Sequence, residues 1–445
     1  MDINSNNIYG SRLGEGIDFR YIHETKFKIS CISVHLLVPM TRENVTVNAV
    51  LSGLLRRTCG KYPEFQQMRR RLAMLYGADA SGSFCSLGNC QMLTLEIMML
   101  DDRFIPNGET IAAECADLLC EMLFRPAREA DGSLFREEDL RHAIKLAEER
   151  IASRINDKGD YALHRCLDEM CAGEPLGLEP GGYPEDLPNV TREALAQAWQ
   201  ELLRTAAVNI VMVGAGDHTA VERRFREEFG RIERAFAPLP EPVIKGRAEC
   251  EREIVERMDV QQCKMVIGMR LPIAEPNDDT MPARVMSMLY GNGVNSLLFQ
   301  NVREKLSLCY YCSSSFARKH GVMLVSCGLE EANYAAALSE IRKQLAVIAD
   351  NAFTDEEFEA IKRAAVNDLE ESKDSIYAIE RWYAMQYGDG CVRTPEQTAE
   401  RLLAVTRREI ADCAAMVTVD TIYLLAPESA DAQEAGEAEE GGDMA

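Results

Sequence analysis

The residues best suited to hold a metal are six histidines, and their spacing disfavours a helix-borne metal site. They are His23, His35, His142, His164, His218 and His320. Two histidines four residues apart would share one face of a helix and could hold Zn²⁺ together, with a glutamate between them acting as base on the zinc-bound water. No two of these histidines are four residues apart, and the sequence contains no H-x-x-E-H. We therefore expect no zinc site of this kind on the chain.

Cysteine, glycine and serine patterns are also better explained by structure than by chemistry. Cys309-Tyr-Tyr-Cys312 is a single C-x-x-C, and on a strand its two thiols would point to opposite faces. Gly291-Asn292-Gly293 lacks the lysine and hydroxyl residue of a phosphate loop, so it predicts a tight turn between two helices. No serine shows a readable arrangement with histidine and aspartate, so a serine hydrolase is not supported.

The composition excludes several classes of protein. The 445 residues are 47% hydrophobic and 27% charged, which is typical of a globular protein. With 72 acidic and 49 basic residues the net charge is −23, which argues against nucleic acid and anionic membranes as partners. We expect no membrane span and no secretory signal, because no apolar run reaches about 18 residues and the start is polar. The fifteen cysteines indicate free thiols in a reducing cytosol.

One pattern of elements occurs twice in the sequence. A strand ending at Pro39 precedes a helical segment at 48–57, and a strand ending at Pro272, 233 residues later, precedes a helical segment at 281–290. The repeated pattern continues with helix-to-strand segments at 67–76 and 300–309, hairpins at 78–100 and 310–329, charged helices at 137–155 and 355–371, and closing strands at 208–214 and 421–427.

This repeat predicts an α+β fold with two tandem homologous domains. Each domain should be a mostly antiparallel sheet with helices packed on one face. We expect an N-terminal domain at 1–234, a Pro-rich linker at 235–249 and a C-terminal domain at 250–427. Residues 428–445 contain seven acids and no bases, which predicts a disordered acidic tail.

The stretch from Leu289 to Tyr310 reads LYGNGVNSLLFQNVREKLSLCY. It resembles the C-terminal-domain signature of the M16 peptidases, the family of pitrilysin, insulinase and the mitochondrial processing peptidase. The usual signature is a Gly-rich turn, then S-R-L-F, then R-E-K-x-G-L-A-Y. This sequence keeps the frame but has Leu297 for Arg, Ser307 for Gly and Cys309 for Ala. The resemblance extends over both halves and implies two M16/LuxS-like metallohydrolase domains.

The resemblance also implies that the zinc motif of the family is degenerate here. Members that cut peptides carry H-x-x-E-H on the first long helix of the N-terminal half, and a downstream Glu completes the ligands. The three motif positions align with Ala49, Ser52 and Gly53, and the downstream ligand falls near His142 or Ala143. Ala and Gly offer no ligand atom and Ser cannot replace the carboxylate base. We therefore expect no metal and no catalytic residue on this chain.

The R…Y pair of the signature is retained as Arg303 and Tyr310. In members where this pair is functional, the Arg bonds substrate carbonyl groups and the Tyr helps to hold the oxyanion. The resemblance thus implies a substrate-binding role for both residues, beside the glycine turn Gly291-Asn292-Gly293. From the residues alone, Arg303 could instead pair with an acid and Tyr310 could simply pack. The adjacent Tyr311 also leaves the register open by one residue.

In two-chain bacterial relatives, one chain carries zinc and the other the R…Y pair, and this sequence is similar to the second chain. It resembles in particular the non-catalytic YfmF-type members, found beside a YmfH-like zinc-motif paralogue and associated with 5-aminopentanol modification of elongation factor P. The implied function is a cytoplasmic subunit that forms a peptide-binding chamber with that paralogue, with zinc on the partner only. The alternatives are a non-proteolytic binding or scaffold homodimer, or a stand-alone metallopeptidase with unorthodox ligands.

Overall fold

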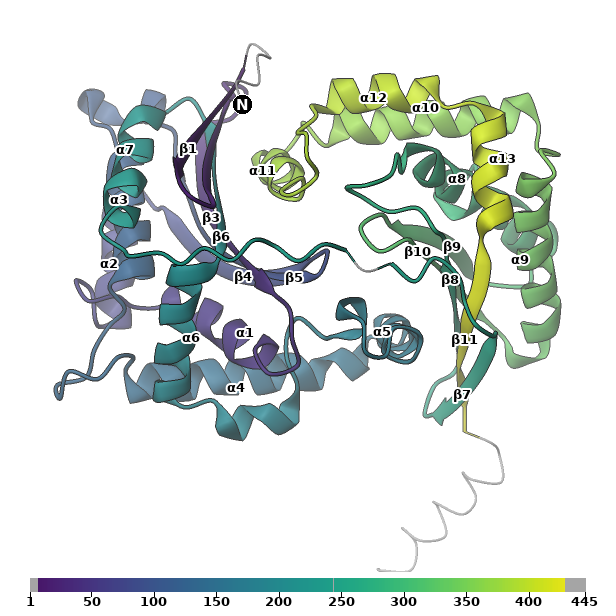
Figure 1. Ribbon diagram of the computed structural model, residues 1–445, viewed down its shortest axis with the longest axis horizontal. Helices are drawn as coiled ribbons and strands as arrows, with labels where there is room; N and C mark the ends of the chain where they lie inside the picture. Colours follow the sequence, from purple (N-terminus) through teal and green to yellow (C-terminus); the bar gives the residue numbers. More distant parts are fainter. Residues whose placement is uncertain (1–6, 243, 429–445) are drawn as a thin grey trace, which may run out of the picture. The chain divides into compact units, whose positions relative to one another are not determined.

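The computed structural model describes residues 7–242 and 244–428, which divide into two compact units (Figure 1). Within those residues, unit 1 comprises 7–152, 178–241 and 370–392, and unit 2 comprises 153–177, 242–369 and 393–428. Each unit therefore includes one segment that is separated by a long stretch of sequence from the rest of that unit. Apart from Glu428, the predicted acidic tail lies outside the described residues.

Unit 1, in its described part, contains a six-stranded sheet in the order β1-β2-β6-β3-β5-β4. Neighbouring strands are antiparallel except for β2 and β6, which are parallel. The strands are β1 Ile8–Gly14, β2 Ile17–His23, β3 Ile29–Pro39, β4 Asp79–Leu87, β5 Cys90–Leu100 and β6 Ala207–Gly214. The α-helices are α1 Val45–Leu55, α2 Phe65–Met74, α3 Ala112–Phe124, α4 Glu137–Ser153, α6 Arg192–Thr205, α7 His218–Phe229 and α11 Ile376–Ala384.

Unit 2 contains, over the residues described, a five-stranded sheet in the order β7-β11-β8-β10-β9, with only β7 and β11 parallel. Its strands are β7 Arg252–Met258, β8 Cys263–Arg270, β9 Tyr311–Ala317, β10 Val322–Leu329 and β11 Thr418–Pro427. Its α-helices are α5 Lys158–Met170, α8 Met281–Gly291, α9 Tyr334–Ala349, α10 Asp355–Glu371, α12 Pro395–Ala404 and α13 Arg407–Met416. The order matches β2-β6-β3-β5-β4 of unit 1, so the predicted α+β fold with a repeated antiparallel sheet is confirmed.

Short helical turns complete the described secondary structure. The 3-10 turns are Asp102–Phe104, Pro106–Gly108, Arg154–Asn156, Pro175–Gly177, Pro184–Asn189 and Glu331–Asn333, and a π-helical segment spans Phe299–Lys305. Residues 230–242 and 244–251 form neither helix nor strand, in the stretch where the sequence predicts the Pro-rich linker.

Local capping signals set several of these helix starts. Thr394 and Thr406 each accept a hydrogen bond from the backbone of the third helical residue, whose own side chain bonds back, so α12 and α13 begin with capping boxes. The Asp157 carboxylate accepts hydrogen bonds from the backbone N–H groups of Gly159 and Asp160 and starts α5. The chain therefore ends α4 and begins a separate helix within a few residues.

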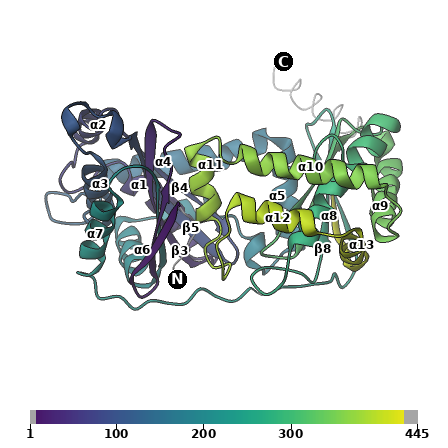
Figure 2. The same cartoon turned by 90° about the horizontal axis from the view of Figure 1, so that it is seen from above.

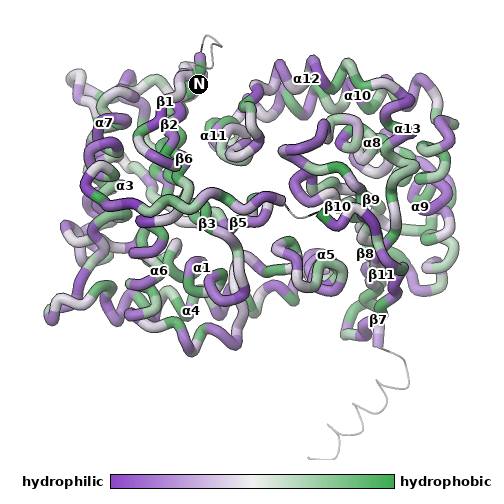
Figure 3. Tube along the Cα trace, viewed as in Figure 1, coloured by the Kyte–Doolittle hydropathy of each residue, from purple (hydrophilic) through white to green (hydrophobic). Residues whose placement is uncertain are grey.

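The long helices are amphipathic, as surface helices of a globular protein should be. α10 buries Phe358, Ile361, Ala365 and Leu369, and most of its other positions are at least partly exposed. In Figure 3, green and purple alternate along the helices, whereas the central strands β3 and β6 are mainly green. Over the described ranges, no helix combines the length and the apolar character needed to cross a bilayer.

The two faces of the unit 1 sheet carry separate cores. Ile32, Val34 and Leu36 of β3 pack with α1, α3, α6 and α7 on one face. Cys31 of β3 and two valines of β6 pack with α11 on the other face. Figures 1 and 2 show α11 on the side of the sheet opposite α3 and α7. The structure thus adds to the predicted layering a single helix that covers the second face.

A buried polar cluster fixes α11 to the sheet. His35 Nε2 lies 2.6 Å from Glu380 Oε1, and both side chains are almost completely buried. Ser33 Oγ donates to the same carboxylate oxygen, and His35 Nδ1 lies 2.8 Å from Thr94 Oγ1. Since β3, β5 and α11 each contribute one or more partners, the cluster determines where α11 sits along the strands.

Unit 2 uses the same arrangement with α5. This helix packs on β8 and β11, and a Cβ built on Gly268 of β8 would lie 2.4 Å from Met170 Sδ of α5. Arg270, at the end of β8, is buried and donates to both carboxylate oxygens of Glu174 and to Asp420. Its NH2 group also donates to the carbonyl of Met170. A glycine and a buried arginine therefore hold α5 against the sheet.

Replacing Glu380 with alanine should destabilise unit 1, because it leaves His35 and Ser33 buried without their carboxylate partner. Removing one member of a buried pair costs about 3–5 kcal/mol, and we expect a loss of about 3 kcal/mol in the apparent free energy of unfolding by urea. The control is Tyr377→Ala on the same helix, whose side chain is exposed, with a loss under about 1 kcal/mol. Equal losses in the two variants would show that the pair does not hold α11.

The same pair should make stability depend on acid pH. Burial alone would raise the pKa of Glu380, but the charge of His35 and the hydrogen bonds from His35 and Ser33 outweigh it and lower the pKa below its usual 4.5. This stabilisation is therefore fully present above the unfolded-state pKa and is lost as pH falls through the folded-state pKa. The stability difference between wild type and Glu380→Gln, measured by urea unfolding, should shrink below pH 4.5. A constant difference would contradict this origin.

Candidate functional site

The three residues that align with the family's zinc motif lie together on α1. Ala49 and Ser52 are buried and Gly53 is partly exposed. A Cβ built on Gly53 would have no heavy atom within 4 Å, so there is open space beside it. Leu51 and Leu54 of the same helix belong to the main core of unit 1. The core therefore holds α1 in place while this part of the helix faces a cavity.

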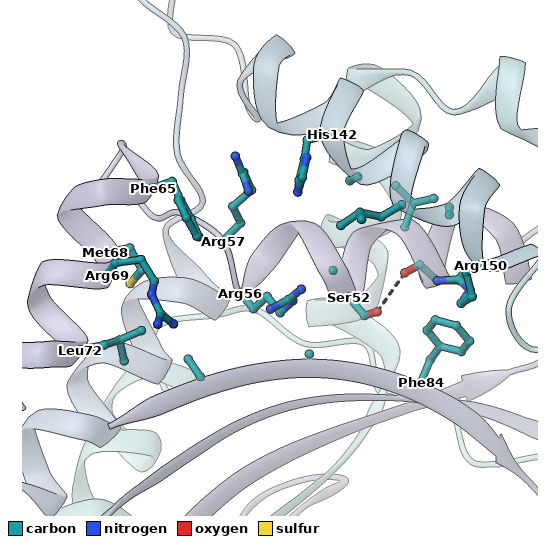
Figure 4. Close-up of a pocket in the computed structure, with 18 residues that line it drawn as sticks. Ser52, Arg56, Arg57, Phe65, Met68, Arg69, Leu72, Phe84, His142 and Arg150 are labelled. Carbon is teal, nitrogen blue, oxygen red and sulfur yellow. Dashed lines mark hydrogen bonds between the residues drawn. The ribbon is translucent and has the colours of Figure 1, made fainter. Parts of the chain in front are cut away.

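A pocket of about 370 Å³ opens over α1, with walls from α1, α2, α4 and β4 (Figure 4). Ala49, Ser52 and Gly53 all line it. His142 and Ala143 of α4, where the family's downstream ligand aligns, line it as well. The structure thus places all the zinc-aligned positions around one cavity.

The side chains at these positions do not fit a zinc ion. Ala49 and Gly53 have no ligand atom, and Ser52 Oγ donates a hydrogen bond to the Ala49 carbonyl at 2.9 Å (Figure 4). His142 contributes a single imidazole to the pocket lining. Across the described residues, no group of three or more His, Cys, Asp or Glu side chains is arranged to hold a metal ion. We therefore derive no reaction step through a metal at this site.

Sequence reasoning missed four arginines that line the same pocket. They are Arg56, Arg57, Arg69 and Arg150. Arg150 lies on a helix whose mixed charges are typical of a solvated surface. From that pattern alone, nothing indicates that Arg150 lines a pocket. Arg56 and Arg57 directly follow α1, Arg69 lies on α2 and Arg150 on α4, so their convergence depends on how these three helices pack.

Arg303 of the predicted R…Y pair lies on the π-helical segment with its side chain substantially exposed. Its guanidinium carbon lies 4.6 Å from the centre of the Phe299 ring. Its Nε is 3.5 Å from Glu304 Oε1, a long contact with the adjacent residue. The guanidinium group is thus oriented by an aromatic ring and remains accessible for further hydrogen bonds.

Tyr310 lies immediately before β9, and its side chain is 52% exposed. Its hydroxyl donates to Glu330 Oε1, and this hydrogen bond to a carboxylate raises the pKa of Tyr310. The phenol therefore stays protonated and can act as a donor. The side chain of Tyr311, in contrast, packs against Gly328, where an added Cβ would lie 2.3 Å from the ring. Of the two tyrosines, Tyr310 is the more exposed.

The glycine turn closes the end of α8 against β9. Gly291 is the last residue of α8, and a Cβ on it would lie 2.5 Å from the backbone nitrogen of Ser314. Asn292 follows as the C-terminal cap, and Gly293 adopts a φ of +85°, which glycine tolerates best. Close packing against β9 thus requires glycine at 291, and the positive φ favours glycine at 293.

The C-x-x-C differs from its predicted arrangement. Cys309 precedes β9 and is not on a strand, so the alternation argument does not apply to it. Cys312 pairs with Cys327 across β9 and β10. Hydrogen bonds from the thiols of Cys312 and Cys327 lower the pKa of Cys309.

Comparisons with known proteins agree with this fold. A family model described as the peptidase M16 inactive domain matches residues 189–365, a range that includes Arg303 and Tyr310. The probable inactive metalloprotease YmfF of Bacillus subtilis is 26% identical over 410 residues, covering 92% of this chain and 96% of that protein. An uncharacterized zinc protease of Streptomyces coelicolor is 25% identical over 249 residues, 54% of this chain and 52% of that protein.

Two solved structures show the same fold. A conserved protein from Enterococcus faecalis V583 has a TM-score of 0.86 at 24% identity, covering 95% of this chain and 99% of that one. A peptidase M16 inactive domain from Pseudomonas fluorescens has a TM-score of 0.74 at 15% identity, with the same coverage. Together with YmfF and the family model, they confirm the resemblance seen in the stretch from Leu289 to Tyr310. The chain is therefore a homologue of the M16 metalloproteases, similar to a family model and to a Bacillus subtilis relative that are both described as inactive.

Proposed function

We propose that this chain is the non-catalytic subunit of a two-chain M16 zinc peptidase. It would form a peptide-binding chamber with a paralogue that carries H-x-x-E-H, and zinc would be bound by that paralogue. The observation that carries the proposal is the combination of two features on one chain. The zinc-aligned pocket has no usable ligand set at Ala49, Ser52 and Gly53, while Arg303 and Tyr310 keep exposed, donor-bearing side chains.

In this role, Arg303 and Tyr310 bind the substrate peptide. The Arg303 guanidinium donates charge-assisted hydrogen bonds to peptide carbonyl oxygens, which are strong because the donor is ionised. The Tyr310 hydroxyl exchanges its bond to Glu330 for one to the oxygen that becomes negative in the transition state. The glycine turn at Gly291 and Gly293 sets the end of α8 beside β9, the strand that follows Tyr310.

The subunit is proposed to act in the cytoplasm, with neither nucleic acid nor membrane as a partner. The net charge of −23 supports this, because it repels phosphate backbones and anionic lipid surfaces. The resemblance to YfmF-type members further suggests a link to the modification of elongation factor P.

The two-chain arrangement predicts a specific partner. A mild affinity pull-down of the full chain from its own cytosol, analysed by mass spectrometry, should recover a near-stoichiometric protein that contains H-x-x-E-H. The purified chain alone should not hydrolyse peptides. Recovery of the chain alone or as a homodimer would contradict the two-chain proposal and favour the binding-scaffold alternative. Hydrolysis by the purified chain with bound metal would favour the stand-alone peptidase.

Within the reconstituted complex, Arg303→Ala should reduce kcat by roughly 10²-fold, the effect of removing one transition-state donor. The fold should not change, because the Arg303 side chain is exposed. Lys305→Ala is the matched control, an exposed cation on the same π-helical segment, and it should leave kcat within about twofold. Steady-state kinetics on a fluorogenic peptide gives both values. If Arg303→Ala behaves like Lys305→Ala, the substrate role of Arg303 is wrong.

A further inference from the structure

The pocket over α1 is strongly basic within an acidic protein. We call it the arginine pocket, defined by Arg56, Arg57, Arg69, Arg150 and His142 among its lining residues. No aspartate or glutamate lines it, although the chain as a whole carries a net charge of −23. A pocket with this local inversion of charge attracts anions and excludes cations such as Zn²⁺.

Several of the arginines are held in fixed orientations. Arg57 stacks on Phe65 at 4.5 Å and its Nε bonds to Asp139 at 2.7 Å. Arg150 lies over the Phe84 ring at 4.6 Å, and its NH2 group donates to a backbone carbonyl at 2.8 Å. A guanidinium that is stacked on a ring loses less conformational entropy when it binds a ligand. The pocket is thus partly preorganised.

Arg56 and Arg69 supply the more available charge. The Arg56 side chain is exposed and forms no hydrogen bond or ion pair with any residue that the structure describes. A Cβ built on Gly82 of β4 would lie 3.2 Å from Arg56 Cδ. The aliphatic part of the Arg56 side chain therefore packs on β4, where that strand approaches α1. Arg69 makes only a long contact with Asp79, at 3.6 Å between exposed side chains, and such pairs are worth little. Figure 4 shows both arginines at the pocket between α1 and α2.

The remaining lining of the pocket is largely apolar and its size suits a small group. Met68, Leu72 and Ala147 form buried walls. A volume of about 370 Å³ lies in the range of small-ligand sites. Guanidinium groups match carboxylate and phosphate oxygens in two-point hydrogen bonds. The pocket therefore combines oxyanion donors with an apolar wall.

We propose that the arginine pocket binds an oxyanion, with Arg56 and Arg69 as its principal donors. The shared chemistry is a carboxylate or phosphate group, which could come from an acidic peptide side chain or from a free small anion. The site lies in the pocket that the zinc-aligned positions line, and its two principal donors are not among those positions. This proposal stands independently of the two-chain function, because the pocket lies within unit 1.

The test uses the purified full chain without any partner. Fluorescence anisotropy of labelled hexaglutamate and isothermal titration calorimetry with inorganic phosphate measure the two sources separately. Arg56→Gln and Arg69→Gln should each weaken binding by about tenfold or more, as expected for loss of a charge-assisted hydrogen bond. The matched control is Arg70→Gln, the exposed neighbour of Arg69 on α2 that does not line the pocket, and it should bind like wild type.

The outcomes separate the possibilities. Binding of hexaglutamate that is lost in Arg56→Gln and Arg69→Gln, and kept in Arg70→Gln, supports a peptide carboxylate as the ligand. The same pattern with phosphate alone supports a free anion. If neither probe binds wild type, or if all three variants weaken binding equally, the site is wrong and any binding reflects general surface charge. Circular dichroism of each variant verifies that the fold is intact, and the outcome of the pull-down does not affect this test.

Discussion

The placement of one helix on the second face of each sheet is the constraint on which the rest of this structure depends. In both units that helix comes from a distant part of the sequence, and a buried charged group fixes it. His35 and Glu380 meet beneath α11, and Arg270 binds Glu174 and Asp420 beside α5. A buried charge without its partner costs several kcal/mol, so each pair tolerates one placement of its helix and disfavours others. Without these helices, each sheet would leave its second face open to water.

In both units a helix must be held on the second face of the sheet, and the two units do this with different residues at equivalent positions. His35 and Gly268 are 233 residues apart, the offset of the whole repeat, and each lies where the covering helix crosses the central strand. Unit 1 places a polar side chain there and fills the space with a hydrogen-bonded cluster. Unit 2 places a glycine there, and an added Cβ would lie 2.4 Å from Met170 Sδ of α5, so a larger residue would force Met170 to shift. The backbone arrangement is therefore the same in both units, while the contact at this one position is polar in unit 1 and steric in unit 2.

The pocket over α1 shows why a degenerate metal site can remain a pocket. Its walls are set by core packing of α1 and by the close approach of β4, where Gly82 lies against the Ser52 carbonyl. Neither contact depends on the side chains at the zinc-aligned positions, so the pocket does not need zinc ligands to keep its volume. Basic side chains then occupy its rim, which is compatible with stability because most of them are partly exposed or stacked on rings. The R…Y pair lies in unit 2 on separate elements, so it can be retained independently.

The sequence by itself determined the local elements, the fold class, the family and the absence of a usable zinc motif. Strands β3 and β8 and helices α1, α8 and α10 fall within a few residues of their predicted bounds, because alternation, apolar periodicity and Pro or Gly stops are short-range signals. Only the tertiary structure decided that α5 and α11 pack with the unit distant in sequence, that His35 meets Glu380, and that Arg56, Arg69 and Arg150 share one pocket. Each of those outcomes depends on which faces of distant elements meet. These contacts depend on the burial and charge pairing of the whole folded chain. The spacing of residues within a single segment therefore does not predict them.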